Sequence, residues 1–463
     1  MPPPRITLPF CRCSYRCGFL VYGKTEGWNS VPICISLTRW NENAITDKTE
    51  KIAKIRDKLL SKENQMLRQY VVALGVCIAG VAHAQETIKI GVIGPFTGQS
   101  SSDMGESIRG GARVFADEVN RFGGVLGRKI ELIEKDDQAK ANIGADLTKE
   151  LIEKDKVSAV VGFANIAVAN AAVPLLQKAR IPLIVSAAAG GEITRQANLP
   201  PNTPNFIFRV AGRDSLQTKA MFKDLVDRRR ITEIAILHDV TPYGEGGKAN
   251  AMADLTARGI KPVAIESFKI GDQDMTAQLA RARAAGAKAI ALYGLAAEDA
   301  MVAKSLVKLN WKVPLVGTWT MSQRSFTDLA GPAAEGARAA VTFIEDERGG
   351  VTYAFGQTYR KVNMVTSIPS GVAASQTYDA LRLLFLAMYQ CNCSDSERIR
   401  SALENLQYSA RSTVVTRYDQ PFTPGDHEAI SANMVVMGEI HNGRFFYAYK
   451  EDESASLITR TKE

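Results

Sequence analysis

The residues TIKIGVIGP at positions 87–95 have the pattern of a buried first strand in an α/β protein. Apolar side chains fill most of these positions, which is typical of a strand covered by helices on both faces of its sheet. Gly94 and Pro95 then end the strand with a turn. A helical pattern follows at residues 105–120, so the segment predicts a strand–helix unit at the start of the folded protein.

The same alternation of strands and helices continues along most of the chain. Further strands are predicted at residues 129–135, 157–161, 182–185, 233–238, 263–268, 289–293, 314–318 and 339–343. Helices are predicted at residues 145–154, 168–178, 246–258, 275–285, 298–309 and 373–389. Two further strands, at 432–438 and 444–449, predict a closing hairpin around His441-Asn442-Gly443. This order indicates two α/β lobes with parallel sheets, and a polar, proline-rich passage at 198–205 interrupts the pattern.

The residues before the first strand have the three parts of a secretory signal. Met66-Leu67-Arg68 is a short basic start, residues 70–81 are apolar, and Ala82-His83-Ala84 has small residues where a signal peptidase cleaves. An apolar run of roughly 12 residues is too short for a bilayer crossing, which needs about 20, so cleavage after Ala84 is favoured over a membrane anchor. Cys77 leaves lipid attachment open as an alternative. We expect a periplasmic protein with no membrane insertion of the mature chain.

Residues 1–65 precede this complete signal and show no sustained helical or strand period. They are therefore predicted to be a disordered, non-native upstream extension, with Met66 as the true first residue. Four of the seven cysteines lie there, without the paired spacing of zinc sites: Cys11, Cys13, Cys17 and Cys34. The mature chain keeps Cys391 and Cys393, whose redox state the spacing leaves open.

Charge and motif content exclude several classes of function. The first 84 residues hold 12 of the 57 Lys and Arg residues and 6 of the 49 Asp and Glu residues, so the rest carries a net +2. Short basic runs such as 228–230 lack interleaved aromatic residues, which argues against a nucleic-acid partner. A serine-nucleophile elbow, a phosphate-binding loop and histidines at metal-ligand spacing are all missing from the sequence. We expect no enzyme, no metal and no cofactor, but a small-molecule ligand in a cleft between lobes.

Seven short motifs occur in a characteristic order. They are IGVIGPFTG at 90–98, NRFGGVLGRK at 120–129, DD at 136–137, VVG at 160–162, IPLIVSA at 181–187, HD at 238–239 and YGEG at 243–246. With them, the chain from about residue 86 to its end resembles the periplasmic substrate-binding proteins of branched-chain amino acid ABC transporters. The resemblance implies the type I periplasmic binding fold, in which two hinged, Rossmann-like lobes are joined by three crossovers of the chain.

The resemblance also implies lobe boundaries and a ligand site. One lobe is expected at 86–208 plus 322–430, and the other at 209–321 plus 431–463. In the family, loops at strand ends hold the ligand's carboxylate and ammonium groups. The matching positions here are Ile166, Ala188, Gly190, Tyr243 and Asp272.

Two of these positions differ from the leucine-binding members, which carry serine where Ile166 stands and threonine where Gly190 stands. Without these two hydroxyls, the polar groups that the first lobe offers to a ligand are its backbone N–H groups and the side chains of Asn165 and Ser186. Each hydroxyl lost from around a buried charged ligand costs roughly 1.5–3 kcal/mol. An aromatic or aliphatic acid, or an amide, therefore stands beside a branched-chain amino acid as the expected ligand, since a carboxylate can bind backbone donors at a helix start.

The remaining candidates each have two interpretations. Tyr243 is either a ligand contact or a turn tyrosine, and Asp272 either binds an ammonium group or caps a helix. Trp319 and Tyr293 lie at strand ends, where they form either walls of the cleft or core. The expected mechanism is a trap: ligand favours lobe closure, and the permease of an ABC transporter accepts the closed monomer. A periplasmic ligand-sensing subunit of the same fold is the alternative.

Overall fold

The computed structural model describes residues 87–98, 101–191, 193–195, 203–408, 412–454 and 460–463. All of them belong to one of the two units of the chain, His83–Glu463. The predicted upstream extension at 1–65, the signal segment at 66–84 and the first five cysteines lie outside the described residues.

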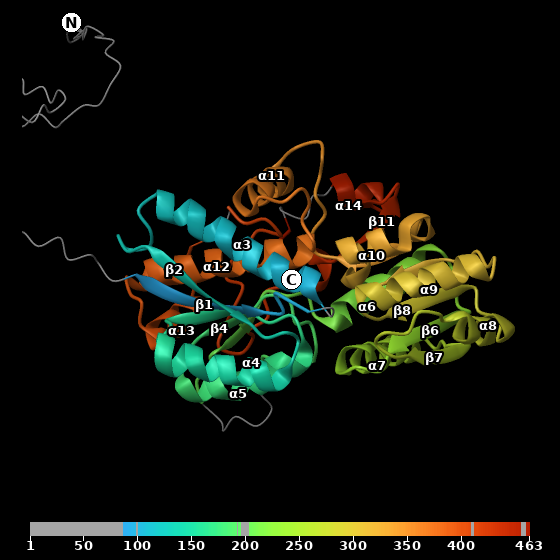
Figure 1. Cartoon of the computed structure of the whole chain (residues 1–463), viewed down its shortest axis with the longest axis horizontal. Helices are drawn as coiled ribbons and strands as arrows, with labels where there is room; N and C mark the ends of the chain where they lie inside the picture. The colour runs from blue at the N-terminus through green and yellow to red at the C-terminus, as the bar shows by residue number, and fades with distance from the viewer. Residues whose placement is uncertain (1–86, 99–100, 192, 196–202, 409–411, 455–459) are drawn as a thin grey trace, which may run out of the picture. The chain divides into compact units, whose positions relative to one another are not determined.

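The first sheet has five parallel strands in the order β2-β1-β3-β4-β5. They are β1 (Ile88–Gly94), β2 (Ile130–Asp136), β3 (Ala159–Gly162), β4 (Leu183–Val185) and β5 (Ile207–Arg209). Helices α3 (Ser102–Arg121) and α12 (Gly371–Cys391) cover one face, and α4 (Ala141–Glu150) and α5 (Ile166–Ala179) cover the other (Figure 1). Neighbouring residues of β1 point to opposite faces, so Val92 packs in the core with α3 while Ile93 packs in the core with α5.

The second sheet has seven strands in the order β12-β11-β10-β9-β8-β6-β7. They are β6 (Ile234–Asp239), β7 (Ala264–Phe268), β8 (Ala289–Tyr293), β9 (Leu315–Gly317), β10 (Arg338–Val341), β11 (Val436–His441) and β12 (Arg444–Tyr447). The strands from β10 to β7 are parallel, whereas β11 runs antiparallel to both β10 and β12. The predicted closing hairpin is therefore confirmed, with its turn at His441-Asn442-Gly443.

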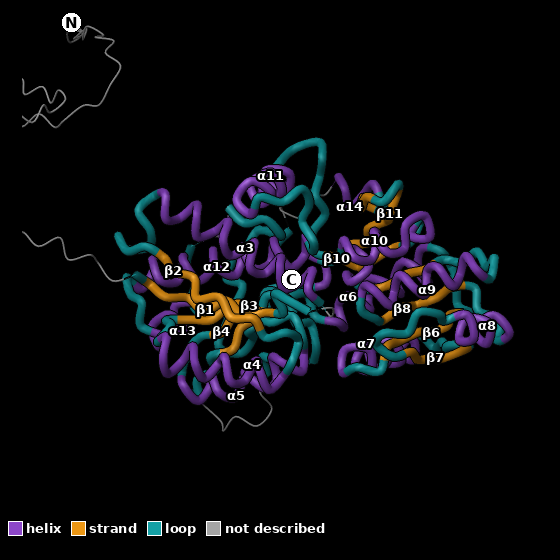
Figure 2. Tube along the Cα trace, viewed as in Figure 1, coloured by secondary structure: helices purple, strands orange, loops and turns teal. Residues whose placement is uncertain are grey.

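Helices of this part of the chain surround the second sheet, as Figure 2 shows. They are α6 (Asp214–Phe222), α7 (Pro242–Ala257), α8 (Thr276–Ala284), α9 (Ala296–Lys308), α10 (Arg324–Ala330) and the short 3₁₀ turns η4 (Trp319–Ser322), η5 (Gly331–Ala334) and η6 (Ala432–Met434). The rest are α11 (Val351–Asn363), α13 (Ser396–Glu404), α14 (Lys450–Ser454) and two π-helical turns, η2 (Leu151–Asp155) after α4 and η3 (Lys223–Arg228) after α6. None of the helices in the described ranges is long and apolar enough to cross a membrane.

The predicted fold class is confirmed, since the chain forms two α/β lobes with parallel sheets. The chain passes between the two lobes three times: after β5, between β10 and α12, and before β11. One assignment differs from the expected boundaries, which placed 322–430 in the first lobe. Strand β10, at 338–341, lies in the second sheet between β9 and β11. The local pattern locates a strand, but the neighbour of a parallel strand lies far along the chain and leaves no local signal.

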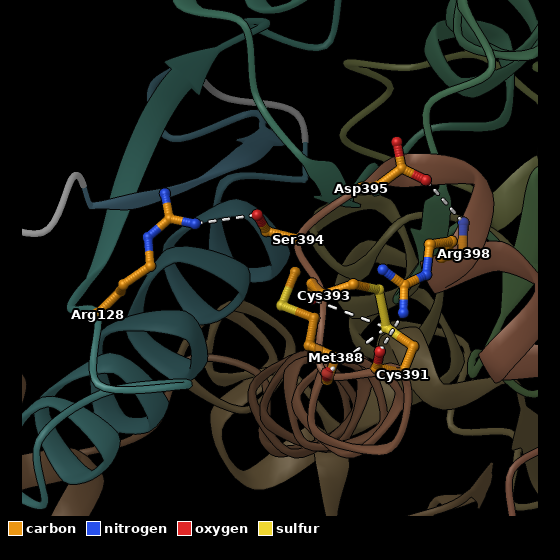
Figure 3. Close-up of a disulfide and its surroundings, with 7 residues drawn as sticks. All are labelled: Arg128, Met388, Cys391, Cys393, Ser394, Asp395 and Arg398. Atoms are coloured by element: carbon orange, nitrogen blue, oxygen red, sulfur yellow. Dashed lines mark hydrogen bonds between the residues drawn. A yellow bond between two sulfur atoms is a disulfide. The ribbon is translucent and has the colours of Figure 1, made fainter.

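A disulfide joins Cys391 and Cys393 at the end of α12, so the redox state left open by the sequence is the oxidised one (Figure 3). Their Cα atoms are 5.2 Å apart, within the usual range for a disulfide. Between them Asn392 takes a left-handed conformation, with φ of 48°, which ends the helix. Arg398 donates a hydrogen bond of 2.6 Å to the Cys391 carbonyl oxygen and so ties the start of α13 to this turn.

Replacing both cysteines with serine is expected to lower the free energy of unfolding only slightly. The cross-link closes a loop with a sequence separation of 2, for which loop entropy gives about 1.6 kcal/mol, against about 3 kcal/mol for a 15-residue loop. Urea unfolding of the wild type and of C391S/C393S measures the difference. A loss above about 3 kcal/mol would contradict a purely local role for this cross-link.

Candidate functional site

A cavity of about 290 Å³ lies where strands of both sheets end. Its lining from the first lobe comes from the start of α3, the turn after β2, the β3–α5 turn and the loop after β4: Ser101, Met104, Gln138, Ala139, Ala164, Asn165, Ile166, Ala167, Ala187 and Ala189. Its lining from the second lobe comes from the starts of α7, α9 and η4: Thr241, Pro242, Tyr243, Leu295, Trp319 and Thr320. The carboxyl ends of parallel strands are the usual place for a ligand in α/β proteins.

A second, larger groove of about 1060 Å³ lies between α10, α11 and the β11–β12 hairpin. Its described lining includes several charged side chains and none of the predicted site residues. The smaller cavity contains four of those residues, namely Asn165, Ile166, Tyr243 and Trp319. Because it also lies at the strand ends, the smaller cavity is the candidate ligand site.

Among the described residues, the lining of this cavity contains no Lys, Arg, His, Asp or Glu. Four helices, α3, α5, α7 and α9, nevertheless begin at its wall. The first amide groups of a helix have no partner within the helix, and the helix dipole adds partial positive charge there. The cavity therefore favours an anionic group while offering no charged side chain of either sign.

Of these four helix starts, that of α5 has neither a capping side chain nor an acidic residue in its first turn. Asn165 precedes the helix with an extended backbone and makes no capping hydrogen bond with its side chain. Its Nδ2 donates to the Ser101 hydroxyl at 3.2 Å, whereas its Oδ1 is buried without a hydrogen-bond partner in the described structure. In α7, by contrast, the Thr241 hydroxyl already accepts from the Tyr243 amide at 3.2 Å. Helices α3 and α9 also lack a capping side chain, but acidic residues in their first turns, Asp103 and Glu298, offset the attraction for an anion, so the α5 amides are the most favourable for one.

Ile166 and Gly190, the two positions that differ from the leucine-binding pattern, contact each other. A Cβ atom on Gly190 would lie 2.3 Å from Cδ1 of Ile166, closer than any real contact between carbon atoms. The isoleucine side chain therefore occupies the space that a larger residue at position 190 would need. The two departures form a matched pair: Ile166 gives this wall an apolar surface, whereas Gly190 lies beside it and is not among the residues that line the cavity.

Tyr243 and Trp319 form the opposite wall. The Tyr243 hydroxyl shares a hydrogen bond of 2.6 Å with the Thr318 hydroxyl. Burial raises the pKa of Tyr243 well above its ordinary value, so the phenol stays neutral. Trp319 is 3% exposed, and its backbone amide donates to the Gln217 side chain at 3.1 Å. These aromatic side chains suit the apolar body of a ligand.

The other predicted residues lie beside the cavity or away from it. Ser186 is buried and accepts from the Thr377 hydroxyl at 2.8 Å, and Ala188 is buried in the core on the α5 side of the first sheet. Tyr293 is buried and donates to the Thr218 hydroxyl at 3.2 Å. The Asp272 carboxylate accepts from the Lys269 amide at 2.8 Å and closes the turn after β7. None of these residues is among those that line the cavity.

The sequence did not identify several residues that line the cavity: Ser101, Met104, Gln138, Ala139, Thr241, Leu295 and Thr320. Thr241 and Pro242 carried a usable signal, because threonine followed by proline marks a helix start. Thr320 and Leu295 carried none, since each is an ordinary residue in a short connection. Within the described ranges, no cluster of three or more His, Cys, Asp or Glu residues is arranged to hold a metal ion.

A buried ion pair supports the loop after β4 from behind. Arg209 is fully buried and donates to both carboxylate oxygens of Glu428, at 2.8 and 2.7 Å. The same guanidinium donates to the carbonyl oxygens of Gly190 at 2.8 Å and Gly191 at 3.2 Å. The pair therefore fixes the loop whose Ala187 and Ala189 line the cavity.

Comparisons with known proteins agree with this arrangement. A family model described as "Periplasmic binding protein" matches residues 87–442. The leucine-, isoleucine-, valine-, threonine-, and alanine-binding protein of Pseudomonas aeruginosa is 25% identical over 347 residues, which cover 74% of this chain and 89% of that protein.

Two solved structures are similar over most of their length. The branched-chain amino acid transporter substrate binding protein LivJ of Streptococcus pneumoniae, in complex with isoleucine, has 25% identity and a TM-score of 0.66, covering 78% of this chain and 97% of that one. A solute binding protein of an ABC transporter from R. palustris, in complex with benzoate, has 20% identity and a TM-score of 0.64, covering 78% of this chain and 95% of that one. The similarity to the benzoate-bound structure shows a shared fold and nothing more.

Proposed function

The chain belongs to the periplasmic binding protein family, whose model matches residues 87–442, and from that premise we propose that it captures a small apolar carboxylate for the permease of an ABC transporter. The resemblance inferred from the seven sequence motifs is confirmed by this membership. The expectation of a binding protein rather than an enzyme agrees with the relatives, which are solute-binding proteins.

The composition of the cavity wall supports a carboxylate as ligand. An anion gains from the helix starts at the wall, above all from the free amides of α5. An α-amino acid would bring an ammonium group as well, and the described lining offers no acidic side chain to pair with it. A buried charge without a partner is strongly unfavourable. A monocarboxylate without an ammonium group therefore fits better than leucine or isoleucine.

The size and the apolar walls support a small aliphatic or aromatic body. The volume of about 290 Å³ is at the lower end of the range of roughly 300–1,000 Å³ for ligand pockets. Ile166 on one side and Trp319 with Tyr243 on the other offer apolar surface to the ligand. The fold itself accommodates either class of ligand, since one solved relative holds isoleucine and another protein of this fold holds benzoate.

The proposed mechanism is closure of two lobes around the ligand. A carboxylate on the α5 amides contacts the first lobe, and its body contacts Tyr243 and Trp319 in the second. Such a ligand favours the closed arrangement, because only that arrangement makes both sets of contacts. The permease, the monomeric state and removal of the signal after Ala84 belong to this proposal, in line with the periplasmic relatives.

A matched pair of ligands tests the proposal directly. Leucine and 4-methylpentanoate share the same carboxylate and side chain and differ only in the ammonium group. In a thermal-shift assay of the purified protein, 4-methylpentanoate or benzoate is expected to stabilise it by about 2.7 kcal/mol at 100 times its dissociation constant. Leucine is expected to have a much smaller effect. Stabilisation by leucine alone would overturn the carboxylate assignment, and no effect of any of the three would overturn the ligand class.

A further inference from the structure

A continuous chain of hydrogen bonds runs from the cavity wall into the core of the second lobe. The Tyr243 hydroxyl contacts the Thr318 hydroxyl at 2.6 Å, and the Thr318 hydroxyl contacts that of Thr320 at 3.0 Å. The Thr320 hydroxyl contacts Oδ2 of Asp299 at 2.7 Å. Tyr243 and Thr320 line the cavity, whereas Asp299 lies behind it in the first turn of α9. A buried carboxyl group is thus connected to the ligand site through hydroxyls alone.

The surroundings of Asp299 favour its neutral form. The residue is fully buried, and its Oδ1 has no hydrogen-bond partner in the described part of the chain. The backbone at Gly294 packs against that oxygen, where an added Cβ would lie 2.4 Å away. An ionised carboxylate held by one hydroxyl in such a place is strongly unfavourable, and the positive end of α9 compensates only weakly.

The charged groups around Asp299 act in the same direction. Burial raises the pKa of Asp299 well above its ordinary value, against the opposing effect of the hydrogen bond with Thr320. Two acids that face it, Asp239 at the end of β6 and Glu298 on α9, raise the pKa further. The cations on the helices packed against α9 bond elsewhere: Arg281 of α8 to Glu266, Arg283 of α8 to the Leu309 carbonyl, and Arg324 of α10 to Asp103. Asp328 of α10 is exposed to solvent, and Lys308 of α9 pairs with Asp274. The turns η4 and η5, which also pack against α9, have no charged side chains.

The protonation state of Asp299 sets the direction of the whole chain, because each hydroxyl donates a single hydrogen. When Asp299 carries its proton on Oδ2, the oxygen that faces Thr320, it donates to Thr320, Thr320 donates to Thr318, and Thr318 donates to Tyr243. The Tyr243 hydrogen then points to the cavity. When Asp299 is ionised, every bond reverses, and Tyr243 presents a lone pair instead.

We propose that neutral Asp299 is a positioning residue that makes Tyr243 a hydrogen-bond donor to the carboxylate of the ligand. This inference rests on the proposed function, because it requires a carboxylate in the cavity. It also extends the specificity of the site beyond the residues that touch the ligand. A solute with a donor group at this position would meet the Tyr243 hydrogen and be disfavoured.

The inference predicts a pH dependence with a definite sign. The neutral form of Asp299 binds the carboxylate, so affinity is full below the pKa of this group and is lost as the pH rises through it. A hydrogen bond to a charged group accounts for about a tenfold or larger change in affinity. Benzoate and 4-methylpentanoate remain ionised from pH 6 to pH 9, so the change in that range reports on the protein.

Calorimetric titration of the purified protein with both acids from pH 6 to pH 9 provides the test. The Asp299→Asn variant can donate from its amide at any pH, so it is expected to keep the affinity of the wild type at pH 6 and to show a smaller decline toward pH 9 than the wild type does. The Thr320→Val variant breaks the chain and is expected to bind about tenfold more weakly at pH 6. Asp214→Asn is the matched control. Asp214 is another buried carboxyl group near Tyr243, and burial raises its pKa to about 7, but it takes no part in the chain of hydrogen bonds. The Asp214→Asn variant is expected to bind both acids more weakly as the pH rises, as the wild type does.

Infrared difference spectra of the wild type against Asp299→Asn add a measurement that needs no ligand. At pH 6 the carbonyl absorption of protonated carboxylic acids is expected to be larger in the wild type than in the variant, and the absence of this difference band would overturn the inference. Binding of the acids with the same decline in Asp299→Asn as in the wild type would overturn it as well and leave the proposed function intact. If neither acid binds the wild type at any pH, the proposed function itself fails.

Discussion

Substituting alanine for Glu428 is expected to lower the free energy of unfolding by about 3–5 kcal/mol, because it leaves a buried guanidinium without its counter-charge. Arg209 is fully buried and has Glu428 as its carboxylate partner, at 2.7 and 2.8 Å. The carbonyl groups of Gly190 and Gly191 would remain as its acceptors. Because these carbonyls belong to the loop at the cavity wall, ligand affinity is expected to fall together with stability.

Urea unfolding of the wild type and Glu428→Ala measures this effect. Glu233→Ala is the matched control, since Glu233 also pairs with a cation, Lys288 at 2.6 Å, but on the exposed surface. An exposed pair contributes little, so the control is expected to unfold like the wild type. If the two variants lost the same small amount of stability, Arg209 would have to find another partner when Glu428 is removed.

Threonine at position 190 is expected to be tolerated only together with serine at position 166. In Gly190→Thr alone, the new Cβ would lie 2.3 Å from the Ile166 side chain, and overpacking of this kind typically costs about 1–3 kcal/mol. The double variant I166S/G190T removes the clash and places two hydroxyls beside the α5 amides. It is expected to recover the lost stability and to bind leucine more tightly than the wild type does.

Unfolding free energies of both variants, with leucine titrations of the double variant, test this pair. Gly246→Thr is the matched control, because a Cβ there would meet nothing within 4 Å. It is expected to change stability by no more than about 0.5 kcal/mol, as ordinary surface substitutions do. Equal losses in Gly190→Thr and I166S/G190T would show that the two positions do not compete for the same space.

The sequence predicted most strands well because a buried parallel strand has a strong local pattern. The strand expected at 289–293 is β8 with those same bounds. Strand β5 was missed, since it has only three residues and follows the proline-rich passage. Helix α13 was also missed although Asp395 accepts a capping hydrogen bond from the Arg398 amide at 3.0 Å, a pattern present in the sequence. The sheet to which β10 belongs depends on partners far along the chain, and local pattern does not encode it.

The sequence identified only some of the residues that line the candidate site, because the direction of a side chain is not encoded locally. Asn165, Ile166, Tyr243 and Trp319 line the cavity. Ile166 and Tyr243 follow from the resemblance to the family, Asn165 from the polar groups beside Ile166, and Trp319 from its place after a strand. Tyr293 was predicted, like Trp319, from its place at a strand end, but its side chain at the end of β8 lies in the core and donates to the Thr218 hydroxyl. Successive residues of a strand point to opposite faces, and the sequence alone does not tell which face a strand-end residue takes. The ligand role of each residue stays a prediction.

The uncharged cavity wall divides recognition between two kinds of atoms. Under the proposed function, main-chain amides at the helix starts attract the anion, and they are present whatever side chain each residue carries. Mutation of a single residue therefore leaves that attraction largely in place, while changes at Ile166, Leu295 or Trp319 reshape the space for the rest of the solute. A lineage of such proteins can exchange one acid for another through a few wall residues without rebuilding its hold on the negative charge.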